Sequence, residues 1–169
     1  LITEQPRSEW RGIMIDCASE PQPLDVLLRA VELCRFYRVG PLHLRLGSDP
    51  SPSYTSAQLE SLVAYGQLRG VQLMPELVLD RVAWSAADPA RLMGELAEAF
   101  PHAPYLHLGS AQRLPEDMPP AAIRAQRAEH LALAQVVRGL GRTPVIWEDL
   151  AFGVAGVVPE DVIVLVRDG

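Results

Sequence analysis

The stretch Tyr105-Leu106-His107-Leu108-Gly109-Ser110-Ala111-Gln112 reads as a buried strand that runs into a tight loop. Apolar residues dominate its first half, and a glycine followed by small and polar residues ends the pattern. Neither the methyl group of Ala111 nor the amide of Gln112 takes up or releases a proton near neutral pH. The stretch therefore predicts a strand whose tip carries no acid and no base.

Similar short apolar runs recur along the chain, and amphipathic helical segments separate most of them. The first four runs start about 30 residues apart, which is the repeat of a β–α unit and predicts parallel strands. The expected strands are Gly12–Cys17, Leu42–Leu46, Val71–Leu77, Tyr105–Gly109, Thr143–Trp147 and Val162–Val166.

The segments between these strands carry helix signals. Thr55 followed by Gln58 has the pattern of a capping box, and Asp88 before Pro89 is typical of a helix start. The helix that begins after Pro120 ends near Gly141, whereas the segment after Trp147 suggests a loop or a short turn. The last long helix is expected to bury Ile123, Leu131, Ala134 and Val137.

Together these elements predict a single α/β domain over residues 1–169, of the (β/α)8 TIM-barrel type with about six of eight β/α units present. An open doubly wound sheet is the alternative. The segment after the first strand is Cys17-Ala18-Ser19-Glu20-Pro21, which lacks a glycine-rich phosphate loop. A nucleotide-binding Rossmann fold is therefore disfavoured, and no cofactor is expected.

The composition is that of an ordinary globular chain of 169 residues, with 21% charged residues and a net charge of −6. The absence of a basic run argues against nucleic acid as a partner. No apolar run approaches the roughly 20 residues of a membrane span. We expect Cys17 and Cys34 to be reduced core residues. Since the chain opens at Leu1 without Met, we expect it to be part of something longer.

The alternation along each strand predicts which side chains face the barrel interior. Polar groups gather on that face, at the strand ends where barrel enzymes place their chemistry. The expected inward side chains are Met14, Asp16, His43, Arg45, Gln72, Met74, Glu76, Tyr105 and His107, with Trp147, Glu148 and Asp149 at the end of the fifth strand.

Each polar group also has a structural interpretation. Asp16 and Glu76 would pair with Arg11, Arg45 or Arg113, since a buried charge needs a partner. These carboxylates are therefore candidates for internal ion pairs as much as for chemistry.

The two histidines on this face, His43 and His107, are more typical of satisfied core residues than of ligands. A metal site made by them and one carboxylate has no H-x-H or H-E-x-x-H spacing to support it, so no metal is expected. Trp147 fits a core position and a sugar platform equally well.

Five segments, in the right order, resemble the catalytic barrel of family 20 glycoside hydrolases, the β-N-acetylhexosaminidases. Leu42–Leu46 resembles the family's H-L-H-L strand, Leu106–Gly109 matches the start of its H-x-G-G-D-E signature, and the others are Pro6–Asp16, Tyr54–Glu76 and Val145–Asp149. The resemblance implies substrate-binding roles for Arg11, Asp16, His43, Glu76, His107 and Trp147.

The departure from the family pattern lies at the catalytic pair. In the family the substrate's acetamido oxygen attacks the anomeric carbon, an Asp orients that acetamide, and a Glu protonates the leaving oxygen. The resemblance places Ala111 and Gln112 at these two positions, so no catalytic residue is expected there. Loss of general acid catalysis alone costs roughly 10²–10⁴ in rate. Glu76, Glu148 and Asp149 are the fallback candidates.

Three functions remain open. We favour a non-catalytic β-N-acetylhexosaminidase-like domain that acts as an interaction or assembly scaffold, with residual binding of an N-acetylhexosamine glycan. The first alternative is an active β-N-acetylhexosaminidase that uses other carboxylates, and the second is a carbohydrate-binding module. An incomplete barrel would leave its first and sixth strands unpaired. We therefore expect a protein partner, further chain or a second subunit to cover those edges.

Overall fold

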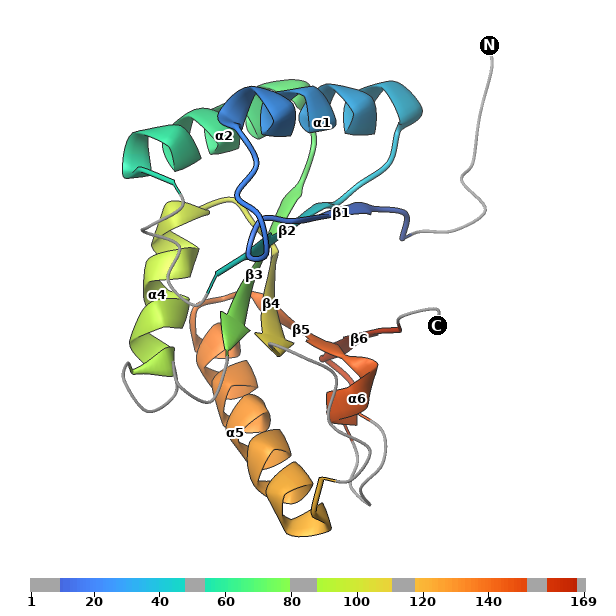
Figure 1. Cartoon of the computed structure of the whole chain (residues 1–169), viewed down its shortest axis with the longest axis vertical. Coiled ribbons are helices and arrows are strands. Elements are labelled where there is room, and N and C mark those ends of the chain that lie inside the picture. Colours follow the sequence, from blue (N-terminus) through green and yellow to red (C-terminus); the bar gives the residue numbers. More distant parts are fainter. Residues whose placement is uncertain (1–9, 48–53, 80–87, 111–117, 152–157, 167–169) are drawn as a thin grey trace.

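The structure, a computed structural model, describes residues 10–47, 54–79, 88–110, 118–151 and 158–166. Strands and helices alternate along the chain (Figure 1). The strands are β1 (Ile13–Asp16), β2 (Leu42–Leu46), β3 (Leu73–Leu79), β4 (Tyr105–Ser110), β5 (Thr143–Trp147) and β6 (Ile163–Leu165). The helices are α1 (Leu24–Tyr37), α2 (Ser56–Arg69), α4 (Pro89–Ala99), α5 (Pro120–Gly139) and α6 (Glu148–Ala151).

All six strands are parallel and lie in the sheet in their order along the chain, β1-β2-β3-β4-β5-β6. The sheet curls, and helices α1, α2, α4 and α5 cover its outer face (Figure 1). A sheet with simple sequential order and outer helices is a partial (β/α) barrel, because a doubly wound sheet would reverse its strand order at one point. The predicted barrel type is confirmed.

Most element boundaries agree with the sequence pattern. Strand β3 begins two residues later than expected, because Val71 belongs to the turn that follows Gly70 at the end of α2. A one-turn helix, α6, follows Trp147, where a loop or a short turn was expected. Glu148 and Asp149 therefore open a helix instead of ending a strand.

The main core lies between the outer face of the sheet and the helices. The leucines of β2 and β4 that point outward are at most 1% exposed, namely Leu42, Leu44, Leu46, Leu106 and Leu108. Helix α5 presents a face slightly rotated from the expected one. Leu133 is buried in place of Leu131, while Ala134 and Val137 are buried as expected.

Capping interactions define where the second helix begins. The predicted capping box is present, with the Thr55 hydroxyl accepting from the Gln58 N–H and the Gln58 amide accepting from the Thr55 N–H. The buried Tyr54 hydroxyl donates to the Gln22 carbonyl at 2.9 Å and accepts from its N–H at 3.1 Å. This contact ties the start of α2 to the segment that leads into α1.

The two cysteines, Cys17 and Cys34, are buried and free, as expected. Among the described helices, none combines the length and the apolar character that crossing a bilayer requires.

Strands β1 and β6 form the two edges of the described sheet, since β1 pairs with β2 and β6 with β5. Ile13 and Met14 of β1 are 37% and 48% exposed, and Val166 beyond β6 is 66% exposed. A cavity of about 390 Å³ has residues of both edges among its lining, together with Trp10, His43, Met74 and Trp147. The open side of the half-barrel is therefore largely apolar.

Candidate functional site inside the half-barrel

A row of charged side chains crosses the inner face of the sheet at a single level. The strand register aligns Asp16 with Arg45, Arg45 with Glu76, and Glu76 with His107. Because side chains alternate along a strand, the leucines on either side of these residues point to the helical layer instead. Four neighbouring strands thus bring one polar group each to the same place.

Arg45 joins the two carboxylates of this row. Its Nη1 atom lies 2.9 Å from Asp16 Oδ2, and its Nε atom lies 3.3 Å from Glu76 Oε1. Asp16 also accepts hydrogen bonds from the N–H groups of Ala18 and Ser19, at 2.9 and 3.0 Å, and from the Ser19 hydroxyl at 2.9 Å. Of the arginines expected to pair with the carboxylates, Arg45 is the one that does so among the described residues.

The hydrogen bonds to Asp16 keep it ionised. Burial by itself would raise the pKa of this carboxyl, but hydrogen bonds from Ser19 and the charge of Arg45 outweigh burial and lower it. Both oxygens of Asp16 are occupied by the turn after β1 and by Arg45. Asp16 therefore has a structural role, because it links the turn after β1 to Arg45 of β2.

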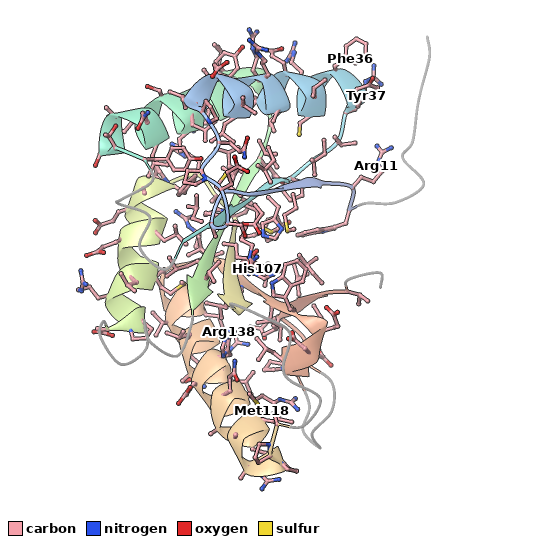
Figure 2. The ribbon with its side chains drawn as sticks, viewed as in Figure 1. Arg11, Phe36, Tyr37, His107, Met118 and Arg138 are labelled. Carbon is pink, nitrogen blue, oxygen red and sulfur yellow. The ribbon has the colours of Figure 1, made fainter. Side chains whose placement is uncertain are left out.

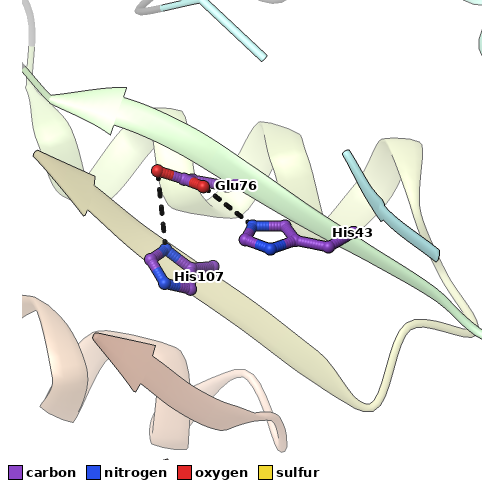
Figure 3. Close-up of side chains that lie close together, drawn as sticks. All are labelled: His43, Glu76 and His107. Atoms are coloured by element: carbon purple, nitrogen blue, oxygen red, sulfur yellow. Dashed lines mark ion pairs between the residues drawn. The ribbon is translucent and has the colours of Figure 1, made fainter. Parts of the chain in front are cut away.

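Glu76 is the centre of the site and is completely buried. His43 Nε2 lies 2.7 Å from its Oε2 atom, and His107 Nδ1 lies 3.8 Å from its Oε1 atom (Figure 3). The Trp147 indole donates a hydrogen bond to Oε1 at 3.1 Å. Burial would raise the pKa of Glu76, yet the neighbouring imidazoles and the indole N–H outweigh it and lower that pKa.

Three rings pack together around the glutamate. The His107 and Trp147 centroids are 4.7 Å apart, those of His43 and His107 are 4.9 Å apart, and those of His43 and Trp147 are 5.9 Å apart. Trp147 is only 6% exposed. Its ring is part of the packed interior, and with His43 it forms one wall of the cavity between the sheet edges.

Gly109 of β4 makes room for the glutamate. A Cβ atom built on Gly109 would lie 2.3 Å from Glu76 Oε1 and 2.7 Å from Glu76 Cγ. These distances are far below van der Waals contact, so no larger residue fits while Glu76 keeps its position. The glycine of the H-x-G motif is thus explained by packing, which the sequence analysis did not anticipate.

A further buried histidine, His130 of α5, was missed by the sequence analysis. It is 2% exposed, and its Nδ1 atom lies 2.9 Å from the Gln126 carbonyl oxygen. Burial lowers the pKa of His130 below its ordinary value of 6.5. The signal that could have found it is the stripe of Arg127, His130, Ala134 and Val137 on one face of the helix.

Other expected site residues lie apart from this cluster. Arg11 is exposed, and its guanidinium donates to the Arg38 carbonyl at 3.3 Å, away from the barrel interior (Figure 2). Glu148 and Asp149 are half-buried in the first turn of α6. Ala111 and Gln112, with Arg113, lie outside the described residues. The sugar-contacting roles expected for Arg11 and the other residues remain predictions.

Comparison with solved structures identifies the fold. The Vibrio harveyi GH20 exo-β-N-acetylglucosaminidase superposes with a TM-score of 0.73 at 18% identity, over 98% of this chain and 39% of that chain. The Streptomyces coelicolor A3(2) GH20 β-N-acetylhexosaminidase gives a TM-score of 0.74 at 20% identity, over 96% and 43%. The chain has the fold of these family 20 glycosidases over the part of the barrel that it covers. It spans less than half the length of these structures.

Curated sequences agree with this family resemblance. A β-hexosaminidase of Akkermansia muciniphila is 29% identical over 46% of this chain and 22% of the relative. The β-hexosaminidase subunit A1 of Dictyostelium discoideum is 23% identical over 52% and 20%. The chain thus spans about a fifth of the curated relatives it matches. No family model matches the sequence.

We predict that Gly109→Ala destabilises the domain by about 1–3 kcal/mol, because the added methyl group collides with a glutamate that several partners hold in place. Gly94→Ala in α4 is the matched control, since no described atom other than those of its chain neighbours and its own helix backbone lies within 4 Å of its Cβ position. That control should be neutral or stabilise by up to about 1 kcal/mol. Urea denaturation measures both, and equal stability of Gly109→Ala and the parent would contradict the prediction.

We further predict that the free energy of unfolding decreases as the pH falls below 6.5. The folded state keeps His130 neutral while the unfolded chain binds a proton, so its contribution is present above the ordinary pKa of 6.5 and is lost below it. One proton accounts for at most about 1.4 kcal/mol per pH unit. Denaturation at several pH values should show a shallower slope for His130→Gln, and an unchanged slope for the exposed-site control His102→Gln.

Proposed function

We propose that this chain is a non-catalytic β-N-acetylhexosaminidase-like domain that acts as an interaction or assembly scaffold. The observation that carries the proposal is the sequence after Gly109, where Ala111 and Gln112 stand at the positions of the family's Asp–Glu pair. Alanine provides no charge to orient an acetamide, and glutamine has the shape of glutamate without an acidic proton.

The surroundings of the other carboxylates support the same proposal. Asp16 and Glu76 are both engaged by Arg45, and Glu76 is also enclosed by two histidines and a tryptophan. A glycosidase needs two carboxyl groups facing a sugar-sized space across the scissile bond. A carboxylate with 0% exposure, held on both oxygens, does not provide one of them.

One observation favours an active enzyme as the alternative. The Oε2 atom of Glu148 is enclosed and has no hydrogen-bond partner among the described residues. Among the described carboxylates at the strand ends, Glu148 and the adjacent Asp149 are thus the remaining candidates for an acid and a base. A carbohydrate-binding module is less well supported, because Trp147 is packed against the histidines and offers little ring face for a sugar.

Residual sugar binding fits what similar structures contain. Two variants of the Streptomyces plicatus β-hexosaminidase, with one aspartate replaced by alanine or by asparagine, are described in complex with the product GlcNAc. Both share the fold of this chain at 21% identity. Loss of a single aspartate is therefore compatible with sugar binding in this fold.

We predict that the purified chain does not hydrolyse an aryl N-acetyl-β-glucosaminide above the buffer rate, because neither Ala111 nor Gln112 can protonate a leaving group. An active β-hexosaminidase such as the Akkermansia muciniphila relative serves as positive control. Release of the aryl alcohol is followed by absorbance, alongside Glu148→Gln and Asp149→Asn variants. Turnover that either substitution abolishes would establish the alternative and overturn the proposal.

We also propose that the open edges of the half-barrel are the interaction surface, covered by a partner, further chain or a second subunit. Support comes from the exposed Ile13 and Met14 on β1 and from Val166 beyond β6. Unpaired strand edges with apolar side chains favour pairing with another chain.

We therefore predict that the 169-residue chain alone self-associates in sedimentation velocity experiments. A charge on the edge, Ile13→Lys, should shift it toward monomer, since edge lysines oppose strand pairing. Leu68→Lys on α2 is the matched control, because Leu68 is 74% exposed on a helix away from both edges. A stable, soluble monomer of the parent chain at all concentrations would contradict this prediction.

A further inference from the structure

The cluster of His43, Glu76 and His107 has the composition of a transition-metal site. One ligand atom from each residue, two imidazole nitrogens and a carboxylate oxygen, lies within 4.8 Å of the others, and all three side chains are buried. Two imidazoles with one carboxylate are a donor set that suits Zn²⁺. The three residues form no recognisable sequence motif, because they are about 30 residues apart along the chain and come from three different strands.

The distances within the cluster bracket those of a bound ion. Zn²⁺ binds nitrogen and carboxylate oxygen at about 2.0–2.2 Å, so ligand atoms around a tetrahedral ion lie about 3.3 Å apart. Here His43 Nε2 lies 2.7 Å from Glu76 Oε2, and His107 Nδ1 lies 3.8 Å from Glu76 Oε1 (Figure 3). These two distances end on different oxygens of Glu76, and the ligand atoms of the three residues lie within 4.8 Å of one another. Binding of the ion therefore requires the imidazole rings to turn until the ligand atoms reach the tetrahedral spacing.

The surroundings orient the carboxylate as an outer shell does at known metal sites. Trp147 Nε1 donates to Glu76 Oε1, and Arg45 lies beside the same oxygen. Arg45 also forms an ion pair with Asp16. The Asp16 carboxylate therefore still balances the charge of Arg45 when the Oε2 atom of Glu76 binds an ion. The two carboxylates and one guanidinium give a local charge of −1 when the imidazoles are neutral, which attracts a divalent cation.

One of the three proposed ligands, His43, borders a cavity that has room for an additional ligand. His43 and Trp147 line the cavity of about 390 Å³ between the two sheet edges. A three-residue site beside such a space has an open coordination position for water or an external ligand. The backbones of β2, β3 and β4 hold the ligands, so the site is built on rigid elements.

We propose that His43, Glu76 and His107 bind one Zn²⁺ ion, with the open coordination position facing this cavity. The proposal is independent of the proposed scaffold function, since it rests on the geometry of the three side chains and not on the missing catalytic pair. It differs from the expectation drawn from sequence that no metal is bound.

The test uses Co²⁺ as a spectroscopic substitute for Zn²⁺. The purified chain, freed of metal with a chelator, is titrated with Co²⁺, and the visible d–d absorption is recorded. We expect saturation at one equivalent and loss of the spectrum on addition of Zn²⁺, but not of Mg²⁺, which prefers oxygen ligands. Absence of a protein-dependent spectrum at any Co²⁺ concentration would overturn the proposal.

Variants separate this site from surface binding. Glu76→Gln and His107→Gln should abolish the spectrum. Trp147→Phe, which removes the hydrogen bond to Glu76 and part of the ring packed against the two histidines, should weaken binding by about 10-fold. His102→Gln, at an exposed histidine, is the matched control and should bind as the parent does. An unchanged spectrum in Glu76→Gln would disprove the site.

A measurement on the unmodified chain covers the case in which those variants fail to fold. Paramagnetic Co²⁺ should shift the imidazole proton resonances of two histidines strongly in NMR spectra. Selective shifts of His43 and His107 would support the site, and selective shifts of His102 or His130 would overturn it.

Discussion

The interior of this half-barrel depends on one buried carboxylate. Glu76 is removed from water completely, and an isolated charge in that position would cost several kcal/mol. Four side chains compensate for that loss, with Arg45 and His43 on one side and His107 and Trp147 on the other. These four side chains come from β2, β4 and β5, and Glu76 itself lies in β3. Its carboxylate therefore adds side-chain contacts among four strands to the backbone hydrogen bonds of the sheet.

This dependence extends to the backbone beside the cluster. The close approach of Glu76 to β4 requires a glycine at position 109. Glu76 also holds Arg45 in place, and Arg45 binds Asp16 on its other side. Asp16 in turn accepts hydrogen bonds from the turn after β1. The contacts of Glu76 thus hold neighbouring strands of the sheet together. That structural role of Glu76 is consistent with the non-catalytic function proposed for this chain.

Much of the architecture follows from local patterns. The β–α period, the capping box at Thr55 and the Asp88-Pro89 start gave the element order and most boundaries, because backbone hydrogen bonding and capping depend on residues close in sequence. The errors arose where tertiary packing decides. The buried face of α5 includes Arg127 and His130, and β3 begins only after the turn that ends α2. Periodicity does not reveal which polar residues a neighbouring strand will satisfy.

The sequence by itself determined the parallel order of strands, most of the inward-facing side chains and the absence of titratable groups at Ala111 and Gln112. Gln72, expected to face inward from the third strand, instead precedes β3 and is exposed. These features depend on chemical identity and on the two-residue repeat of a strand, both of which can be read without coordinates. Only the tertiary structure decided that Arg45, and not Arg11, holds the carboxylates, and that His43, Glu76 and His107 converge within 4.8 Å. The reason is that strand register and sheet curvature set distances between residues some 30 positions apart, and no local pattern contains that information.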